Sequence, residues 1–141
     1  GITGFAGFNY DNILVVHQEN ISKAQAEELN IRDGCCFGPV LIMDGEPNLE
    51  AYNNNSGYNP RTAIGQRSDG AMLLLVIDGR QTTSLGASYE DCVKIMLQYG
   101  AMNAANLDGG SSSVMVYEDR IVNHIVSMRS DRTVPTAWLV K

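Results

Sequence analysis

The sequence predicts an α+β fold: a mixed, largely antiparallel sheet of about eight strands with two helices and one strand–helix–strand crossover. The first observation behind this prediction is a series of short apolar segments separated by turn-forming Asn, Asp and Gly residues. The second is that only two segments combine helical spacing with a capping residue. The length of 141 residues suits one domain, so we expect residues 1–141 to fold as one domain.

A β-hairpin and a helix are expected at the start of the chain. Ile2–Phe8 and Ile13–His17 are apolar segments on either side of a turn rich in Asn and Asp, which is typical of a hairpin. A helix then begins at Ser22, because Gln25 three residues later completes a capping box. We expect this helix to end by Gly34.

Three strands and a long polar loop are predicted in the middle of the chain. Val40–Met43 is a short apolar strand, and Asn48–Pro60 is a polar segment long enough to be either a functional loop or simply a mobile one. Thr62–Gln66 and Ala71–Ile77 follow as the strands of a second hairpin. Ala71–Ile77 is apolar on both faces, which indicates a central strand.

A second helix and the strand after it complete the crossover. The helix spans Tyr89–Tyr99, and Ser88 with Asp91 forms its N-terminal cap. Ala104–Leu107 is the next strand. Because a strand–helix–strand connection usually joins parallel strands, this strand should run parallel to Ala71–Ile77 and lie beside it.

The C-terminal part is predicted to contain three more strands. Val114–Tyr117 and Arg120–Ile125 form a hairpin across an acidic turn. Ala137–Val140 is the last strand, which completes the antiparallel part of the sheet.

Composition limits the classes of partner. The chain has 10 Lys and Arg residues against 16 Asp and Glu, a net charge of −6 and a pI near 4.7. Nucleic acids and anionic membrane surfaces require a basic patch, so we expect neither as a partner of this chain. Cys35, Cys36 and Cys92 form no metal-binding or disulfide pattern and are expected to be buried apolar side chains.

Two carboxylates and two arginines are expected to meet at one sheet edge. Asp78 and Asp108 directly follow the two crossover strands, and the carboxyl ends of neighbouring parallel strands lie side by side. In the hairpin before Asp78, Arg61 should face Val76, close to that carboxylate. Arg80 lies two residues beyond Asp78. We therefore expect this edge to bind an anionic or sugar-like ligand.

The loop Gly109–Ser113 adds hydrogen-bond donors beside Asp108. Its glycines allow a tight turn whose N–H groups can form an anion-binding nest, and its hydroxyls add further donors. His124 lies opposite this loop in the predicted hairpin, either as a proton carrier or as a structural strand residue. Arg67 and Asp69 belong to the turn at the other end of the sheet and are excluded. The sequence contains no pattern typical of nucleotide cofactors, zinc hydrolases or serine hydrolases.

Three sequence blocks together resemble one protein family in their order and spacing. The blocks are Asn59-Pro60-Arg61-Thr62-Ala63-Ile64-Gly65, Val76-Ile77-Asp78-Gly79-Arg80 and Asn103-Ala104-Ala105-Asn106-Leu107-Asp108-Gly109-Gly110-Ser111-Ser112. They are similar to the phosphodiester glycosidase family, whose bacterial members are commonly labelled exopolysaccharide-biosynthesis proteins. The resemblance runs from about Phe5 to the C-terminus. It implies hydrolysis of a sugar, of the N-acetylglucosamine type, linked through its anomeric carbon to a phosphodiester in a cell wall or exopolysaccharide.

The resemblance also implies roles for individual residues. Asp78 and Asp108 would flank the anomeric carbon, as nucleophile or as base for water. The residues expected to contact the sugar phosphate are Arg61, Thr62, Arg80, Gly109, Gly110, Ser111, Ser112 and Arg132. Arginine suits this role because its guanidinium group binds phosphate oxygens in pairs. No cofactor is predicted.

Two alternative functions stay open. The first is a phosphodiesterase that attacks phosphorus, with a divalent cation on Asp78 and Asp108. The second is a carbohydrate-binding domain of the same fold without catalysis. In each case the partner is a sugar phosphate or a glycan.

The location and the extent of the domain are further expectations. We expect an extracytoplasmic protein, secreted or at the cell surface, whose full-length form is soluble or membrane-anchored. Family members carry an upstream segment, so residues 1–141 should lack an N-terminal part of the domain. A sheet edge left open in this way would favour dimerisation.

Overall fold

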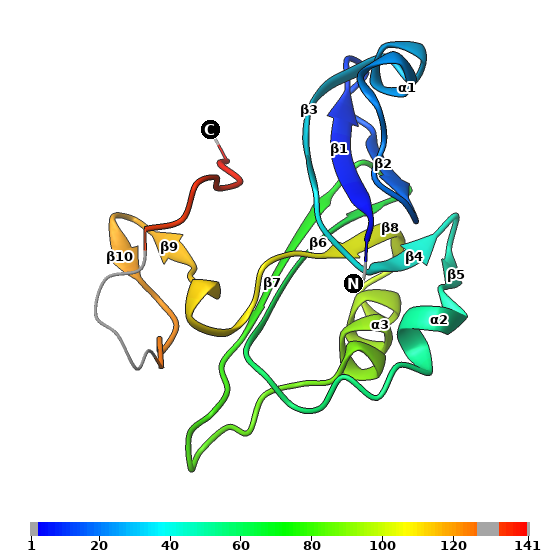
Figure 1. The fold of residues 1–141 in the computed structure, drawn as a ribbon. Coiled ribbons are helices and arrows are strands. Elements are labelled where there is room, and N and C mark those ends of the chain that lie inside the picture. The colour runs from blue at the N-terminus through cyan, green and yellow to red at the C-terminus, as the bar shows by residue number, and fades with distance from the viewer. Residues whose placement is uncertain (1–2, 127–132, 141) are drawn as a thin grey trace.

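The computed structural model describes residues 3–126 and 133–140. Its largest element is a five-stranded sheet of order β5-β4-β8-β6-β7, in which every neighbouring pair is antiparallel (Figure 1). The strands are β4 (Val40–Met43), β5 (Glu46–Pro47), β6 (Arg61–Arg67), β7 (Met72–Ile77) and β8 (Ala101–Asn106). The predicted α+β class is confirmed, with more strands than the sequence indicated.

A second, three-stranded sheet contains the predicted N-terminal hairpin. Its strands are β1 (Phe5–Asn9), β2 (Leu14–His17) and β3 (Ile31–Cys36), in the order β2-β1-β3. Sequence reasoning missed β3, because this segment contains Arg, Asp and Gly in place of an apolar alternation. Gly34 and Gly7 face each other here: a Cβ on Gly34 would lie only 2.7 Å from the Cα of Gly7. Glycine therefore allows the backbones of β3 and β1 to approach closely.

Three α-helices are present in the described residues. They are α1 (Lys23–Glu28), α2 (Leu49–Tyr52) and α3 (Tyr89–Gln98). The capping box of Ser22 and Gln25 begins α1 as predicted, but the helix ends well before Gly34. It ends early because Asn30 takes a left-handed conformation, φ 54°, and turns the chain into β3. α3 has its predicted cap, whereas α2 lies inside the segment expected to be a loop.

The C-terminal hairpin is shorter than predicted. It consists of β9 (Val116–Tyr117) and β10 (Arg120–Ile121), preceded by a 3₁₀ turn, η1 (Gly110–Ser112). The prediction of a strand at Ala137–Val140 is wrong, since this segment is irregular. The segment contacts the three-stranded sheet through Trp138, which packs edge-on against Phe8 with the ring centroids 5.4 Å apart.

The position of β7 corrects two predictions. β7 is an edge strand and not a central one, and Leu74 on it is 43% exposed. β7 and β8 are both antiparallel to β6, so they are parallel to each other as predicted, but β6 lies between them. The ends of the two crossover strands are therefore two strand spacings apart, roughly 9.6 Å, and not one.

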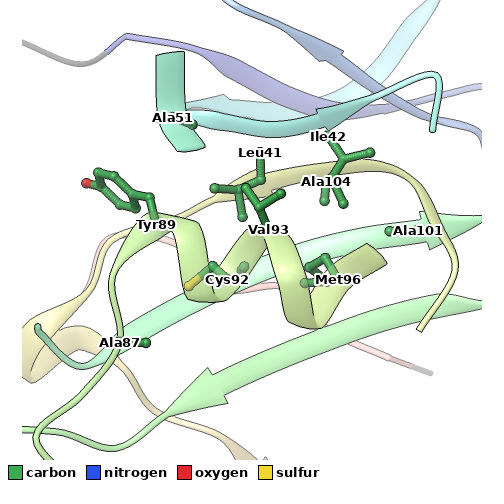
Figure 2. Close-up of a cluster of buried hydrophobic side chains, with 11 residues drawn as sticks. Leu41, Ile42, Ala51, Ala87, Tyr89, Cys92, Val93, Met96, Ala101 and Ala104 are labelled. Atoms are coloured by element: carbon green, nitrogen blue, oxygen red, sulfur yellow. The ribbon is translucent and has the colours of Figure 1, made fainter. Parts of the chain in front are cut away.

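The five-stranded sheet is covered on both faces (Figure 1). Ala104 and Ala105 are consecutive on β8, yet they belong to different buried clusters, as side chains on opposite faces of a strand must. Val93 and Met96 of α3 join the first cluster (Figure 2), and Leu14 of the three-stranded sheet joins the second. The fold thus has three layers: three-stranded sheet, five-stranded sheet, helix. No helix in the described part of the chain is long and apolar enough to cross a membrane.

The three cysteines are free thiols in different environments. Cys92 is fully buried on α3 as predicted, and burial raises the pKa of its thiol to about 11. Cys35 is half-buried, and burial raises its pKa as well. Cys36 is exposed, so the prediction that all three are buried is wrong for this residue. Neighbouring residues in a strand face opposite sides, which explains the difference between Cys35 and Cys36.

One end of the five-stranded sheet is tied to the smaller sheet by two polar side chains. Gln66 and Asn103 are paired across β6 and β8. The Gln66 amide oxygen accepts from the Leu14 N–H at 2.7 Å, and its nitrogen donates to the carbonyls of Asn12 at 2.9 Å and Gly70 at 3.2 Å. The Asn103 amide donates to the Leu14 carbonyl at 2.9 Å and accepts an N–H from the β4–β5 turn. We call this end of the sheet the tied end.

Candidate functional site

The opposite end of the sheet, which we call the site end, contains the predicted site residues. Here β6 begins at Arg61, β7 ends at Ile77 and β8 ends at Asn106. Asp78 and Asp108 therefore follow strands that finish at the same edge, as predicted. They are separated by the start of β6, because the two crossover strands are not neighbours.

The β6–β7 hairpin differs from the prediction by one residue in register. Arg61 faces Ile77, one residue further along than expected. The reason is the turn, which is closed by the Arg67 N–H bonded to the Ala71 carbonyl at 2.9 Å. Arg67 also pairs with Asp69 at 2.7 Å in this turn, at the tied end. Both residues therefore lie in the turn at the opposite end of the sheet, where the sequence places them.

Arg61 anchors a loop at the site end. Its side chain is buried, 7% exposed. Nε donates to the Ala87 carbonyl at 2.9 Å, and Nη2 donates to the Ser56 hydroxyl and the Gly57 carbonyl, both at 3.0 Å. The guanidinium carbon lies 4.1 Å from the centroid of the Tyr89 ring, a cation–π contact. Nε and Nη2 of Arg61 therefore donate to partners within the protein, and phosphate binding by Arg61 stays a prediction.

Asp78 is oriented by the segment after the C-terminal hairpin. Its half-buried carboxylate accepts the His124 N–H at 3.0 Å from each oxygen and the Asn123 side-chain amide at 3.1 Å. The same amide donates to the Ser113 carbonyl at 2.8 Å. The contact of His124 with the site is thus made by its backbone and not by the ring considered as a proton carrier. Sequence reasoning missed Asn123, a polar residue inside a predicted apolar hairpin.

Glycines hold three segments against Pro60. A Cβ on Gly79 would lie 2.7 Å from the Pro60 nitrogen, and one on Gly109 would lie 2.7 Å from the Pro60 carbonyl oxygen. A Cβ on Gly86 would lie 2.5 Å from the backbone of the residue before Pro60. The Gly110 N–H donates to the Pro60 carbonyl at 2.9 Å. Only glycine permits such approaches, so these residues bring the loops after β7 and β8 to the start of β6.

Arg80 lies against the glycine loop. The residue is exposed and has a left-handed backbone, φ 58°, which is uncommon for a residue with a side chain. Its Nη2 donates to the Asn59 amide oxygen at 2.9 Å, and a Cβ on Gly110 would lie 3.3 Å from its Nη1. The structure thus brings together Arg80 and Gly110, two of the residues predicted to bind phosphate.

Four buried polar atoms at the site end have no hydrogen-bond partner within the described residues. They are Thr62 Oγ1, Asn106 Oδ1, Ser112 Oγ and Ser113 Oγ. A buried polar group without a partner costs about 1–3 kcal/mol, so these four atoms are available to a water molecule or to a ligand. Thr62 and Ser112 are among the residues predicted to contact the sugar phosphate, and Ser113 belongs to the loop predicted to add donors, whereas Asn106 was not predicted. Asn106 could have been found, because it is an amide in an otherwise apolar strand end.

Three predicted site residues remain: Asp108, Ser111 and Arg132. Asp108 and Ser111 are half-buried, before and within the 3₁₀ turn. Arg132 lies outside the described residues. Within residues 3–126 and 133–140, no group of three His, Cys, Asp or Glu side chains could hold a metal ion.

Fold and site define an α+β domain with two carboxylates, an exposed arginine and a Gly/Ser loop at one sheet edge. A model of the phosphodiester glycosidase family matches residues 2–141. This chain belongs to the phosphodiester glycosidase family, as its three sequence blocks predict.

Two curated proteins are similar over part of this chain. It is 37% identical over 97 residues to YomE, an uncharacterised SPbeta prophage-derived protein of Bacillus subtilis (strain 168). The matching region covers 67% of this chain and 15% of YomE. It is 34% identical over 64 residues to the bovine N-acetylglucosamine-1-phosphodiester alpha-N-acetylglucosaminidase, covering 45% of the chain and 12% of that enzyme. The chain therefore spans only a small part of the length of either relative.

Three solved structures share the fold. The zebrafish N-acetylglucosamine-1-phosphodiester alpha-N-acetylglucosaminidase catalytic domain, auto-inhibited by its pro-peptide, has a TM-score of 0.72 and 23% identity, covering 97% of this chain and 48% of that one. A hypothetical protein from Synechocystis has a TM-score of 0.60 and 29% identity over 79% of this chain and 21% of its own. A putative exported protein of Burkholderia pseudomallei K96243 has a TM-score of 0.54 and 23% identity, with coverages of 91% and 37%.

Proposed function

We propose that this chain is a glycosidase domain that hydrolyses the bond between the anomeric carbon of a sugar and a phosphodiester oxygen. Family membership supports a glycosidase-type activity on phosphodiester sugars. The observation that carries the proposal to this chain is the arrival of Asp78 and Asp108 at one sheet edge, beside Arg80 and Gly110. The products would be a free sugar and a phosphomonoester.

The two carboxylates would act on opposite sides of the anomeric carbon. The ends of β7 and β8 are two strand spacings apart, roughly 9.6 Å. Carboxyl groups about 6.5–9.5 Å apart leave room for an attacking water and invert the anomeric configuration. One of Asp78 and Asp108 would activate this water while the other assists at the leaving oxygen. The separation of the two carboxyl groups themselves, which sets inversion or retention, is read from the anomeric configuration of the released sugar.

Arg80 is the better supported of the two predicted phosphate-binding arginines. It is exposed and lies beside Gly110, whereas Arg61 is buried and bonded to a loop. The hydroxyls of Thr62 and Ser112 are buried donors without a protein partner in the described residues. A guanidinium group with such donors stabilises the charge that develops on a departing phosphate.

The test compares two aspartates at opposite ends of the same sheet. Replacing Asp108→Asn should lower kcat for a sugar-1-phosphodiester by about 10²–10⁴-fold, the usual contribution of acid–base catalysis. Asp69→Asn, in the exposed turn at the tied end, is the matched control and should leave kcat unchanged. If the two variants turn over substrate at similar rates, Asp108 is not a catalytic residue.

A carbohydrate-binding domain without catalysis is the second candidate. One observation favours it: Asp78 and Arg61 already have protein partners, as residues with structural roles do. This function predicts that sugar phosphates bind and are not hydrolysed. The same assay therefore separates the two candidates.

The setting of the reaction is also proposed. We infer an N-acetylglucosamine-type sugar in a cell wall or exopolysaccharide, processed outside the cytoplasm. The similarity to the bovine N-acetylglucosamine-1-phosphodiester alpha-N-acetylglucosaminidase supports this type of sugar, and the net charge of −6 supports a partner other than nucleic acid. Association of two copies through the β7 edge is supported by the exposure of Leu74, 43%, on that strand.

A further inference from the structure

A polar hollow of about 220 Å³ lies at the site end, on the β4 side of the sheet. Pro39 and Val40 line it from the start of β4, and Asn48 and Asn54 line it from either end of α2. Pockets for drug-sized ligands measure roughly 300–1,000 Å³, so this hollow suits a smaller group, such as one sugar ring.

The strand order places the hollow beside the β8 end of the site. β4 is antiparallel to β8, so β4 begins where β8 ends. The Asn106 N–H donates to the carbonyl of Pro39, a lining residue, at 2.9 Å. Along the edge the order is therefore the hollow, then the β8 end with Asp108, then β6, and then β7 with Asp78 and Arg80.

The lining of the hollow suits hydroxyl groups and disfavours phosphate. It contains no Lys or Arg. Its polar side chains are the hydroxyl of Thr3, the amides of Gln18, Asn48 and Asn54, and the carboxylates of Glu19 and Glu50. Carboxylates repel an anionic phosphodiester, whereas amides and carboxylates both bond to sugar hydroxyls. The phosphate would therefore lie away from the hollow, on the Arg80 side.

Asn54 is the half-buried lining amide that is available to a ligand, whereas Gln18 is exposed. The Asn48 side chain is already used, since it donates to the Val40 carbonyl at 2.9 Å and accepts the Glu50 N–H at 3.1 Å. Asn54 is half-buried, and its side chain makes no hydrogen bond to the residues that the structure describes. Its backbone is fixed through its N–H, which donates to Ala51 at 3.2 Å.

We propose that this hollow is the subsite for the sugar ring of the substrate and that Asn54 binds its hydroxyl or acetamido groups. The inference rests on the proposed function and gives the substrate a direction along the sheet edge. The sugar lies on the β4 side, the anomeric carbon lies at Asp108, and the phosphodiester lies toward Arg80.

The experiment titrates the intact chain with two separate probes, N-acetylglucosamine and inorganic phosphate. Asn54→Trp fills the hollow and should weaken N-acetylglucosamine binding roughly tenfold or more, with phosphate binding unchanged. Asn55→Trp changes the exposed neighbouring residue and is the matched control for the added indole. Arg80→Gln should have the opposite effect, with phosphate binding weakened and sugar binding retained.

A second variant covers a failure of Asn54→Trp to fold. Asn54→Ala removes the amide without adding bulk and should also weaken sugar binding, whereas Asn55→Ala should not. Equal sugar affinity in the Asn54 and Asn55 variants would overturn the proposal, as would a parent chain that binds phosphate but no N-acetylglucosamine at millimolar concentration.

Failure of this inference and failure of the proposed function give different results. If the chain binds both probes at the assigned places and never hydrolyses a sugar phosphodiester, the subsite stands and the catalytic function fails. If the chain hydrolyses the substrate and Asn54→Trp leaves KM at the value of Asn55→Trp, the function stands and the subsite is wrong.

Discussion

The two ends of the five-stranded sheet differ in whether all of their buried polar atoms have hydrogen-bond partners. At the tied end, the amide groups of Gln66 and Asn103 have partners on both their oxygen and nitrogen atoms. At the site end, Thr62, Ser113 and the Asn106 amide oxygen have none within the described residues. Gln66, Asn103, Thr62 and Asn106 lie on the same two strands, β6 and β8, and Ser113 follows the 3₁₀ turn after β8.

We interpret this difference as a division between residues that stabilise the fold and residues of the candidate ligand site. A polar group buried with its partners joins elements and contributes to stability, while one buried without partners lowers it. The glycines around Pro60 fit the same division, because they bring three loops together without side chains between them. Substitutions at the two ends should therefore affect different measurements.

The largest effect is expected for Asp78→Asn at the site end. Turnover of a sugar phosphodiester should fall by about 10²–10⁴-fold, because one of the two carboxylates is lost. The protein should still fold, since the amide oxygen of Asn can accept the His124 N–H that now bonds to Asp78. Steady-state kinetics with a parallel unfolding titration measures both. Turnover close to that of Asp69→Asn would remove Asp78 from the reaction.

Gln66→Ala should have the next largest effect, and on stability alone. The substitution leaves the N–H of Leu14, a fully buried residue, without its acceptor, which costs about 1–3 kcal/mol of unfolding free energy. Gln98→Ala, at the exposed end of α3, is the neutral control. Urea unfolding gives the free energies, and kcat of the folded fraction should not change. A large loss of kcat in Gln66→Ala would break the division between the two ends.

Ser113→Ala at the site end should not lower the unfolding free energy and should raise it by up to about 1–3 kcal/mol, because a buried hydroxyl without a protein partner is removed. Ser88→Ala removes a serine hydroxyl that caps α3 and should cost about 1 kcal/mol. The pair thus compares a hydroxyl without a partner and one with a partner. Equal destabilisation of both variants would show that Ser113 has a structural partner.

The smallest expected effect is the pH dependence of the stability of the first turn of α3. Hydrogen bonds from the Ser88 backbone and hydroxyl lower the pKa of the Asp91 carboxyl. A group whose pKa is lowered by folding stabilises the protein above its unfolded pKa and loses this contribution as pH falls through the folded value. The protection of the amides in the first turn of α3, measured relative to their intrinsic exchange rates at each pH, should therefore decrease in acid. Asp91→Asn should remove this pH dependence, and an unchanged profile would contradict the role of the cap.

Local signals predicted much of the fold. The capping boxes at Ser22 and Ser88 act through neighbouring residues, so both helix starts were found. β3 was missed because it is held in place by pairing with β1, which lies far away in sequence. Its own residues show no alternation of apolar and polar side chains that would indicate a strand. The position of β6 between β7 and β8 also depends on which strands pair with each other. The hydrophobicity pattern of a single strand does not indicate its pairing partners.

The candidate site shows the same limit. The common edge of Asp78 and Asp108 was predictable, because it follows from two parallel strands whatever lies between them. The bonding of Arg61 to Ser56 and Ala87 was not, since these partners come from loops whose paths depend on tertiary packing. Asn123 was missed for the same reason: its contact with Asp78 spans 45 positions in sequence.

The most direct test of the proposed reaction is hydrolysis of a sugar-1-phosphodiester in ¹⁸O-labelled water, with mass spectrometry of both products. The site end of this sheet predicts cleavage at the anomeric carbon, so the label should appear in the sugar and the phosphomonoester should stay unlabelled. Label in the phosphate would mean attack at phosphorus and would contradict the roles given to Asp78 and Asp108. Binding without any labelled product would contradict catalysis itself.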